Sequence, residues 1–106
     1  MKVLYVDDIR FPEYFHQIGA EITVARTYNE AIQYIDDSYD IISLDHDLGE
    51  EKTGYDIAKW IVEQDILGNI SIPEDFQFHV HSANPVGKIN IEKYLTNYIN
   101  FKNKNK

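Results

Sequence analysis

Four short apolar runs alternate along the chain with four longer amphipathic segments. The apolar runs cover residues 2–6, 21–26, 39–44 and 76–81, and the amphipathic segments lie within residues 11–18, 27–35, 53–68 and 84–99. A strand followed by a helix, repeated in this way, predicts right-handed crossovers and a mostly parallel sheet with helices on both faces. We therefore expect a three-layer α/β sandwich of four strands and four helices.

Local signals indicate where the predicted helices begin. Thr27 and Thr53 stand at N-cap positions before apolar stripes, and Asn84 followed by Pro85 suits the start of the last helix. A chain of 106 residues has room for a single domain, which we assign to residues 1–100. Residues 101–106, Phe-Lys-Asn-Lys-Asn-Lys, are predicted to form a disordered basic tail.

Composition limits the classes of function. The absence of cysteine excludes disulfides, a thiolate nucleophile and a zinc–thiolate site. Since no apolar run approaches the roughly 20 residues that span a bilayer, and residues 1–20 lack a signal-peptide pattern, we expect a cytoplasmic protein without a membrane partner. A net charge of -8 opposes non-specific DNA binding, whereas a small phosphorylated ligand is compatible with it.

Three of the four predicted strands end in polar side chains that can do chemistry. The acidic pair Asp7-Asp8 follows the first strand, Asp45-His46-Asp47 follows the third, and the stretch from His81 to Asn84 follows the fourth. In a parallel sheet these carboxyl ends meet at one edge, where α/β proteins bind their ligands. The alternative for each stretch taken singly is structural, because Asp, Asn and Gly often end strands.

The candidate metal ligands are the carboxylates of Asp7, Asp8, Asp45 and Asp47. Carboxylates gathered in one place raise each other's pKa, and a bound divalent cation removes that repulsion. An oxygen-only site favours Mg²⁺ or Mn²⁺ over zinc. The alternative is that Asp7 or Asp8 caps the helix after it, and the two roles can belong to different members of the pair.

The candidate catalytic side chains are Arg10, His81 and His46. Arg10 follows the acidic pair and is predicted to bind a phosphoryl group or to form an ordinary salt bridge. His81, at the rim of the sheet, is our first candidate for a general acid or base, and His46 is the second, with a structural role as its alternative. We expect His79 to pack against the last helix.

A phosphate-binding turn is predicted at the start of the last helix. With Asn84 as N-cap, the backbone N–H groups of Val86, Gly87 and Lys88 would face the carboxylates, with the positive end of the helix dipole behind them. Gly87 permits close approach and Lys88 adds positive charge. Ser82 completes the predicted phosphate-binding set.

The acidic pair, Asp45 and Ser82-Ala83 resemble the receiver domains of two-component signalling. In those domains the acidic pair binds Mg²⁺, the third-strand Asp accepts a phosphoryl group, and the Ser or Thr contacts it. Receivers also have a Lys after a fifth strand, followed by a fifth helix. We expect this chain to lack both.

A closer resemblance is to the cyclic-phosphate-processing receiver-like family. The stretches that carry it are Asp7-Asp8-Ile9-Arg10-Phe11-Pro12, Leu44-Asp45-His46-Asp47-Leu48-Gly49, Thr53-Gly54-Tyr55-Asp56 and His81-Ser82-Ala83-Asn84-Pro85-Val86-Gly87. The resemblance implies a receiver/flavodoxin-like sheet in the order 2-1-3-4. It also implies a small ligand that carries a cyclic phosphate, on a nucleotide or at an RNA end.

Three functions are compatible with these residues. The first is a metal-dependent phosphoesterase that processes or hydrolyses a cyclic phosphate. The second is a receiver-type switch that is phosphorylated on Asp45 and read by a partner. The third is a module that binds a cyclic nucleotide without turning it over.

Overall fold

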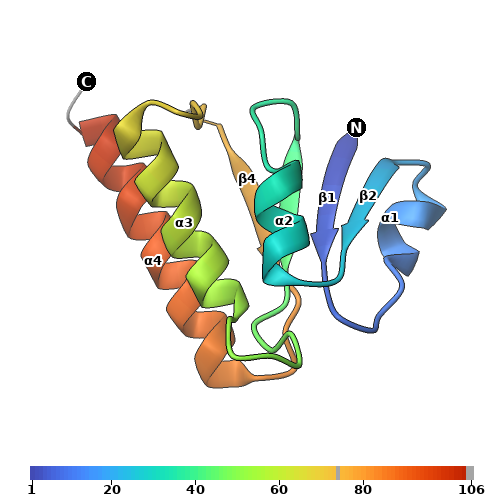
Figure 1. Cartoon of the computed structure of the whole chain (residues 1–106). Helices are drawn as coiled ribbons and strands as arrows, with labels where there is room; N and C mark the ends of the chain where they lie inside the picture. Colours follow the sequence, from blue (N-terminus) through green and yellow to red (C-terminus); the bar gives the residue numbers. More distant parts are fainter. Residues whose placement is uncertain (74, 105–106) are drawn as a thin grey trace.

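The computed structural model describes residues 1–73 and 75–104 and has the expected alternation of strands and helices (Figure 1). The strands are β1 (Lys2–Val6), β2 (Glu21–Ala25), β3 (Ile41–Leu44) and β4 (Gln77–Val80). They form one sheet in the order β2-β1-β3-β4, in which every pair is parallel. The predicted order and fold class are confirmed, and within the described ranges no fifth strand follows β4.

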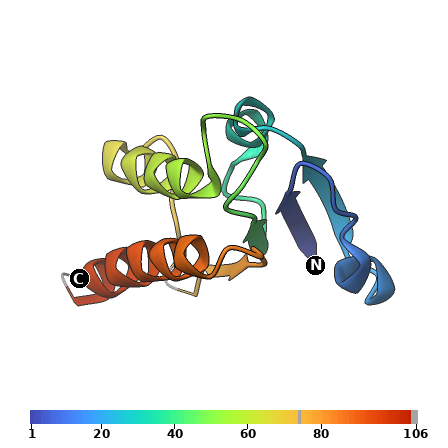
Figure 2. The same cartoon turned by 90° about the horizontal axis from the view of Figure 1, so that it is seen from below.

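Three helices cover one face of the sheet and enclose the main core (Figure 2). They are α2 (Tyr28–Tyr34), α3 (Gly54–Leu67) and α4 (Pro85–Lys104). Alternate strand residues point to this face, so the fully buried Leu4, Val6 and Leu44 pack there against the apolar stripes of the helices. The largest buried side chains that the helices contribute are Ile57, Ile61, Ile91 and Leu95.

The opposite face is covered in the described chain by one short helix, α1 (Glu13–Gln17). We expected a short helix here, with Phe11, Tyr14, Phe15 and Ile18 at helical spacing. Of these four residues only Phe15 is buried, at 4% exposure. Phe11 and Tyr14 are 62% and 63% exposed. A single short helix has no neighbouring helix to pack against, so most of its stripe faces solvent and part of the sheet beside it is uncovered.

The predicted helix starts are confirmed. Thr53 forms a capping box with Asp56, in which each side chain accepts the backbone N–H of the other residue. The Thr27 hydroxyl caps α2 by accepting the N–H of Glu30. None of the helices in the part of the chain that the structure describes is both long and apolar enough to cross a membrane.

Helix α4 continues to Lys104, so residues 101–104 of the predicted basic tail are helical. Lys102 explains this correction, because its Nζ lies 2.9 Å from the Asp65 carboxylate and donates to the carbonyl oxygen of Ile72 at 2.8 Å. Asp65 also accepts the Tyr98 hydroxyl and, at 2.8 Å, the N–H of Ile72. These contacts fix the last turns of α4 against α3. The rest of the predicted tail, residues 105–106, lies outside the described residues.

Candidate functional site

Strand register brings three of the predicted site residues to one edge of the sheet. The last residues of β1, β3 and β4 are register partners, so the next residues, Asp7, Asp45 and His81, emerge side by side. One possible ligand atom from each of the three lies within 4.8 Å of those of the other two. Asp7 is fully buried and Asp45 is 6% exposed. We refer to these three residues as the edge cluster.

Asp7 organises the loop that follows it. Its Oδ1 accepts the backbone N–H groups of Ile9 and Arg10, at 3.0 and 2.8 Å, and its Oδ2 lies 3.1 Å from Nε2 of His81. Burial raises the pKa of Asp7, but these amides and the imidazole outweigh it and hold the pKa below its usual value. Asp7 therefore holds the turn of the loop at Ile9 and Arg10. The predicted alternative, in which Asp7 or Asp8 caps the following helix, is wrong, because α1 begins after Pro12 without a side-chain cap.

The imidazole of His81 is fixed in orientation. Its Nδ1 lies 2.8 Å from the hydroxyl of Ser43, its Nε2 faces Asp7, and the ring stacks on Tyr5 at 4.4 Å between centroids. Burial lowers the pKa of His81, although the charges of Asp7 and Asp45 raise it in part. A neutral ring satisfies both contacts when Nε2 donates to Asp7 and Ser43 donates to Nδ1.

Asp45 is a buried carboxylate whose charge is only partly compensated. Burial raises its pKa above the usual value, and the negative charge of Asp7 adds to the rise. A hydrogen bond from the Ser82 side chain and the positive charge of Arg10 oppose the shift without cancelling it. A cation placed beside Asp45 would therefore be favoured by the protein's own electrostatics.

An open hollow of about 300 Å³, here called the acidic hollow, lies over this edge. Asp8 faces the hollow, since a Cβ added to Gly49 would come within 2.8 Å of the Asp8 Oδ2. Gly49 has a positive φ of 69°, which permits the tight turn that brings this loop close. Oxygen donors around open space suit Mg²⁺ or Mn²⁺, so the residues fit such an ion. The lining residues are Asp8, Ile9, Arg10, Asp45, Asp47, Gly49 and Ala83.

Two arginines hold the rim of the site. Arg10 donates from its guanidinium to the backbone oxygen of His81 at 2.8 Å, which fixes it across the edge cluster. Arg26 donates to the backbone oxygens of Asp7 and Arg10, at 3.1 and 2.7 Å. We did not predict a role for Arg26. Its place directly after β2, beside β1 in the sheet, is the sequence signal that could have found it.

A family model described as the cyclic-phosphate processing receiver domain matches residues 2–97 of the 106 residues. The chain belongs to this family. The match extends from β1 into α4 and includes the whole edge cluster, so the resemblance seen in the sequence motifs is confirmed. A comparison with curated proteins finds no significant match. The chain is thus a receiver-type domain of a family associated with the processing of cyclic phosphates.

His46 of this receiver domain lies apart from the edge cluster. Its ring packs against the first turn of α4, where a Cβ added to Gly87 would meet the His46 Cγ at 2.4 Å. Its Nδ1 lies 2.9 Å from the Asp47 carboxylate, and the Asp47 side chain is 63% exposed. Through Asp47 the imidazole reaches the rim of the acidic hollow, while its packing on Gly87 is structural.

The start of α4 differs from the predicted phosphate-binding turn. The Asn84 side chain accepts the N–H of Gly87 at 3.0 Å, and its backbone oxygen accepts the N–H of Lys88 at 2.9 Å. Two of the three amides that we expected to face a phosphate are therefore used to begin the helix. Among the described residues only the Val86 N–H of this set has no acceptor. The Ser82 hydroxyl accepts the N–H of Asn84 at 3.0 Å and also contacts Asp45.

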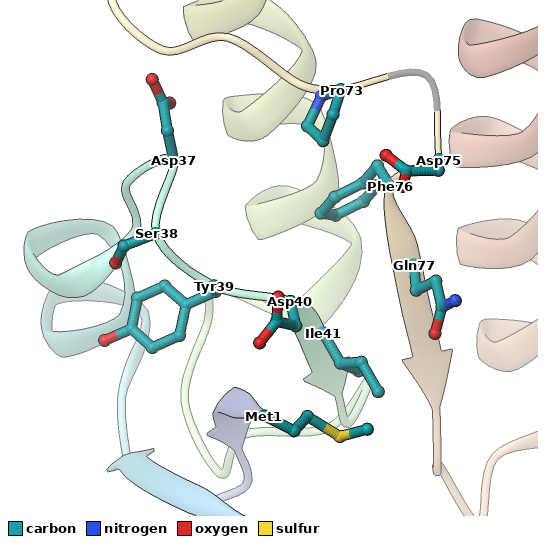
Figure 3. Close-up of a pocket in the computed structure, with 10 residues that line it drawn as sticks. All are labelled: Met1, Asp37, Ser38, Tyr39, Asp40, Ile41, Pro73, Asp75, Phe76 and Gln77. Carbon is teal, nitrogen blue, oxygen red and sulfur yellow. The ribbon is translucent and has the colours of Figure 1, made fainter.

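A second hollow, of about 360 Å³, lies at the opposite edge of the receiver domain, between the amino ends of the strands (Figure 3). Asp37, Asp40 and Asp75 are among the residues that line it. Asp40 accepts the backbone N–H of Lys2 at 2.7 Å and Asp37 accepts that of Ser71 at 2.8 Å. These acidic side chains tie neighbouring loops together, and the edge cluster lies at the other end of the strands.

Proposed function

We propose that this receiver domain binds Mg²⁺ or Mn²⁺ in the acidic hollow and hydrolyses a small cyclic phosphate there. The observation that carries the proposal is the position of Asp45. It is a buried carboxylate with a raised pKa, and it faces open space that Asp8, Asp47 and the Arg10 guanidinium also line. The family description supplies the class of ligand.

The carboxylates of Asp8, Asp45 and Asp47 would hold the cation, because they line the hollow. Both oxygens of Asp7 already have partners, so Asp7 supports the site from behind. When bound, the cation would neutralise charge on the phosphoryl oxygens and lower the pKa of a bound water. Arg10 would bind the phosphoryl oxygens that face the rim, and its bond to the His81 backbone limits its movement.

Opening the phosphate ring requires a proton to leave the attacking water and another to reach the departing alkoxide. His81 is our first candidate for this transfer. Its ring nitrogens contact Ser43 and Asp7, so His81 would exchange a proton with the ligand only when one of these contacts opens. His46, which contacts Asp47 at the rim, is the second candidate. The Ser82 hydroxyl, the Val86 amide and the Lys88 ammonium are the candidate phosphate contacts.

The test is hydrolysis of 2′,3′- and 3′,5′-cyclic nucleotides by the purified protein in Mg²⁺ or Mn²⁺. We expect a linear monophosphate product, loss of activity in chelator, and a roughly 100-fold or larger decrease in rate for Asp8→Asn and Asp45→Asn. Asp75→Asn, an exposed carboxylate at the opposite edge of the sheet, is the matched control and should keep full activity. No turnover in the presence of metal would sink the proposal, and tight binding with recovery of intact ligand would assign a binding module instead.

A second candidate function is a receiver-type switch phosphorylated on Asp45. The observation in its favour is the Ser82 hydrogen bond to Asp45, which resembles the contact that receivers make with their phosphorylated Asp. No fifth strand in the described part of the chain supplies the Lys that receivers use. A stable mass increase at Asp45 after incubation with acetyl phosphate would favour this function over hydrolysis.

A further inference from the structure

A third hollow, of about 440 Å³, lies on the face of the sheet that α1 covers in part. We call it the aromatic hollow, because six of the side chains that line it are rings. They are Tyr5, Phe11, Tyr14, Phe15, His79 and His81. The function proposed above uses only His81 of this set.

Three residues that line the aromatic hollow occupy positions that differ from those predicted from the sequence. Phe11 and Tyr14 were expected to be buried in a helix stripe but instead form an exposed rim. His79 was expected to pack against α4, yet its strand position directs it to the other face, where its ring centroid lies 5.8 Å from that of Phe15. Apolar rings thus surround open space and leave a gap of defined size in the surface.

The rings form a surface suited to a flat aromatic ligand. The Tyr5 and His81 rings are nearly parallel, at 6°, and Phe15 meets Tyr5 edge-on, with 6.3 Å between centroids. Among the described residues no group hydrogen-bonds the His79 imidazole, so it is available to a ligand, as is the Glu13 carboxylate at the margin. Rings for stacking combined with a few polar groups are typical of sites for a nucleobase.

The linings of the aromatic hollow and the acidic hollow share no residue but are connected through Arg10, Phe11 and His81. His81 lines the aromatic hollow and belongs to the edge cluster with Asp45. Phe11 lines it as well, and its neighbour Arg10 lines the acidic hollow and donates to the His81 backbone. A ligand that places a phosphate at Arg10 can therefore reach the aromatic hollow across the His81 side of the rim.

We propose that the aromatic hollow binds the base of a nucleoside cyclic phosphate whose phosphate lies in the acidic hollow. This inference rests on the proposed function and narrows its ligand to cyclic phosphates that carry an aromatic base. A volume of about 440 Å³ lies within the range of small-ligand sites and accommodates a base with part of its ribose. A cyclic phosphate on a small polyol would leave these rings uncovered.

Calorimetry with two ligands that share the cyclic phosphate tests this. Adenosine 2′,3′-cyclic phosphate carries a base, and glycerol 1,2-cyclic phosphate does not. We expect the nucleotide to bind at least 10-fold more tightly, and Phe11→Ala and His79→Ala to weaken nucleotide binding 5-fold or more without changing glycerol cyclic phosphate binding. Tyr34→Ala, an exposed ring on α2, is the matched control and should change neither affinity.

Equal affinity for the two ligands, or no effect of Phe11→Ala and His79→Ala, would overturn the base site while leaving the proposed function intact. If neither cyclic phosphate binds, the proposed function fails, and NMR titration with adenosine alone still decides the inference. Shifts confined to Tyr5, Phe11 and His79 would support the base site, and their absence would overturn it. A dimer that Phe11→Ala dissociates would also overturn it, because the face would then belong to a second copy of the chain.

Discussion

Asp7 and Asp8 are adjacent in sequence, but their side chains point to different sides of the sheet and have different roles. Strand alternation directs Asp7 to the same side of the sheet as Tyr5, where His81 and the amides of the following loop satisfy its carboxylate. Asp8 points to the other side, toward Gly49 and the acidic hollow. An acidic pair after a strand therefore supplies one anchor for a loop and one free carboxylate for a ligand.

The variant Asp45→Asn should show whether Asp45 is a metal ligand or a structural residue. Because burial and Asp7 raise the pKa of Asp45, its ionised form opposes folding at neutral pH, and removing the charge should leave the melting temperature in chelator equal or higher. The Mg²⁺-induced rise in melting temperature should disappear. Melting curves of both proteins, each with chelator and with excess Mg²⁺, measure this.

A structural role for Asp45 predicts the opposite change in melting temperature. If Asp45 were a structural cap, its replacement would lower stability by roughly 0.5 to 2 kcal/mol and leave the Mg²⁺ shift intact. A variant that melts lower in chelator yet responds fully to Mg²⁺ would remove Asp45 from the metal site.

Substitution of Gly54 or Gly87 by alanine tests how closely α3 and α4 pack against the residues around the site. A Cβ at Gly54 would lie 2.0 Å from the backbone oxygen of Asp45, whereas a Cβ at Gly87 would meet the side chain of His46 at 2.4 Å. Gly54→Ala should cost about 3 kcal/mol or more, because the strand end has no room to move. Gly87→Ala should cost about 1 to 3 kcal/mol, and adding His46→Ala should recover part of it.

Urea unfolding of the single and double variants measures these differences. At an open helix position Gly→Ala stabilises a protein by up to about 1 kcal/mol, so stabilisation by either single change would contradict the packing described here.

Strand alternation made much of the candidate site predictable, and it also explains what was missed. Asp7, Asp45 and His81 stand directly after predicted strands, so their convergence followed from the parallel sheet. Ser43 and Tyr5 lie inside apolar runs, and their contacts with His81 depend on the register between β1, β3 and β4. The pattern of a single strand carries no information about register.

The pair of helices α3 and α4 is joined by a polar contact that makes stability depend on pH. Burial raises the pKa of Asp65, but the Ile72 amide, the Tyr98 hydroxyl and Lys102 outweigh it and hold the pKa below its usual value. The stability that Asp65 contributes is therefore complete above its unfolded pKa, about 3.9, and is lost as the pH falls through the folded-state value. Burial, with Asp65, raises the pKa of Tyr98 to about 12.

Asp65→Asn should lower the free energy of unfolding at pH 7 by about 1.5 to 3 kcal/mol, the range for hydrogen bonds to a charged group. The difference from the wild type should shrink in acid, because the wild-type carboxylate is then protonated. Between pH 10 and pH 12 the free energy of unfolding should fall less for Tyr98→Phe than for the wild type. The reason is that ionisation of the wild-type hydroxyl opposes folding in this pH range.

Urea titrations across pH 3 to 12 measure both the Asp65 effect in acid and the Tyr98 effect in alkali. Asp36→Asn is the control, because this carboxylate also has a lowered pKa but accepts its bonds from Ser38 on an exposed loop. An equal effect of the Asp36 and Asp65 changes would contradict the joining role of Asp65.

Helix α4 shows why a helix end is hard to predict from composition. Lys102 and Lys104 lie in a run of polar residues, which predicted a solvated chain end. Cations in the last turn of a helix are favourable, however, and Lys102 also contacts Asp65 on α3 and Ile72 in the connector after it. Helix α1 shows the reverse error. Its apolar spacing predicted burial, but only Phe15 packs against the sheet. The described chain has no second helix on that face to cover Phe11 and Tyr14.

The whole molecule carries a net charge of -8, so any cation stabilises it to some extent by screening. Specific binding of Mg²⁺ should add a stabilisation that grows with the logarithm of the free ion concentration and is about 2.7 kcal/mol when the free ion is at 100 times its Kd. Melting curves in Mg²⁺ and in NaCl of matched ionic strength separate the two effects. Asp8→Asn should keep the stabilisation by screening and lose the additional stabilisation that is specific to Mg²⁺. Identical responses to both salts would contradict a metal site.

The sheet order β2-β1-β3-β4 also determines how the chain must fold. Every pair of neighbouring strands is parallel, so each pairing closes a loop that contains at least one whole helix, and the described chain has no hairpin from which the sheet can grow. Such non-local pairing slows folding, because loop entropy is lost before contacts form. During synthesis β1 leaves the ribosome before both strands that flank it, and β3 has an unpaired edge until β4 follows. The edge that carries Asp7, Asp45 and His81 is therefore completed last, when residues from distant parts of the chain meet.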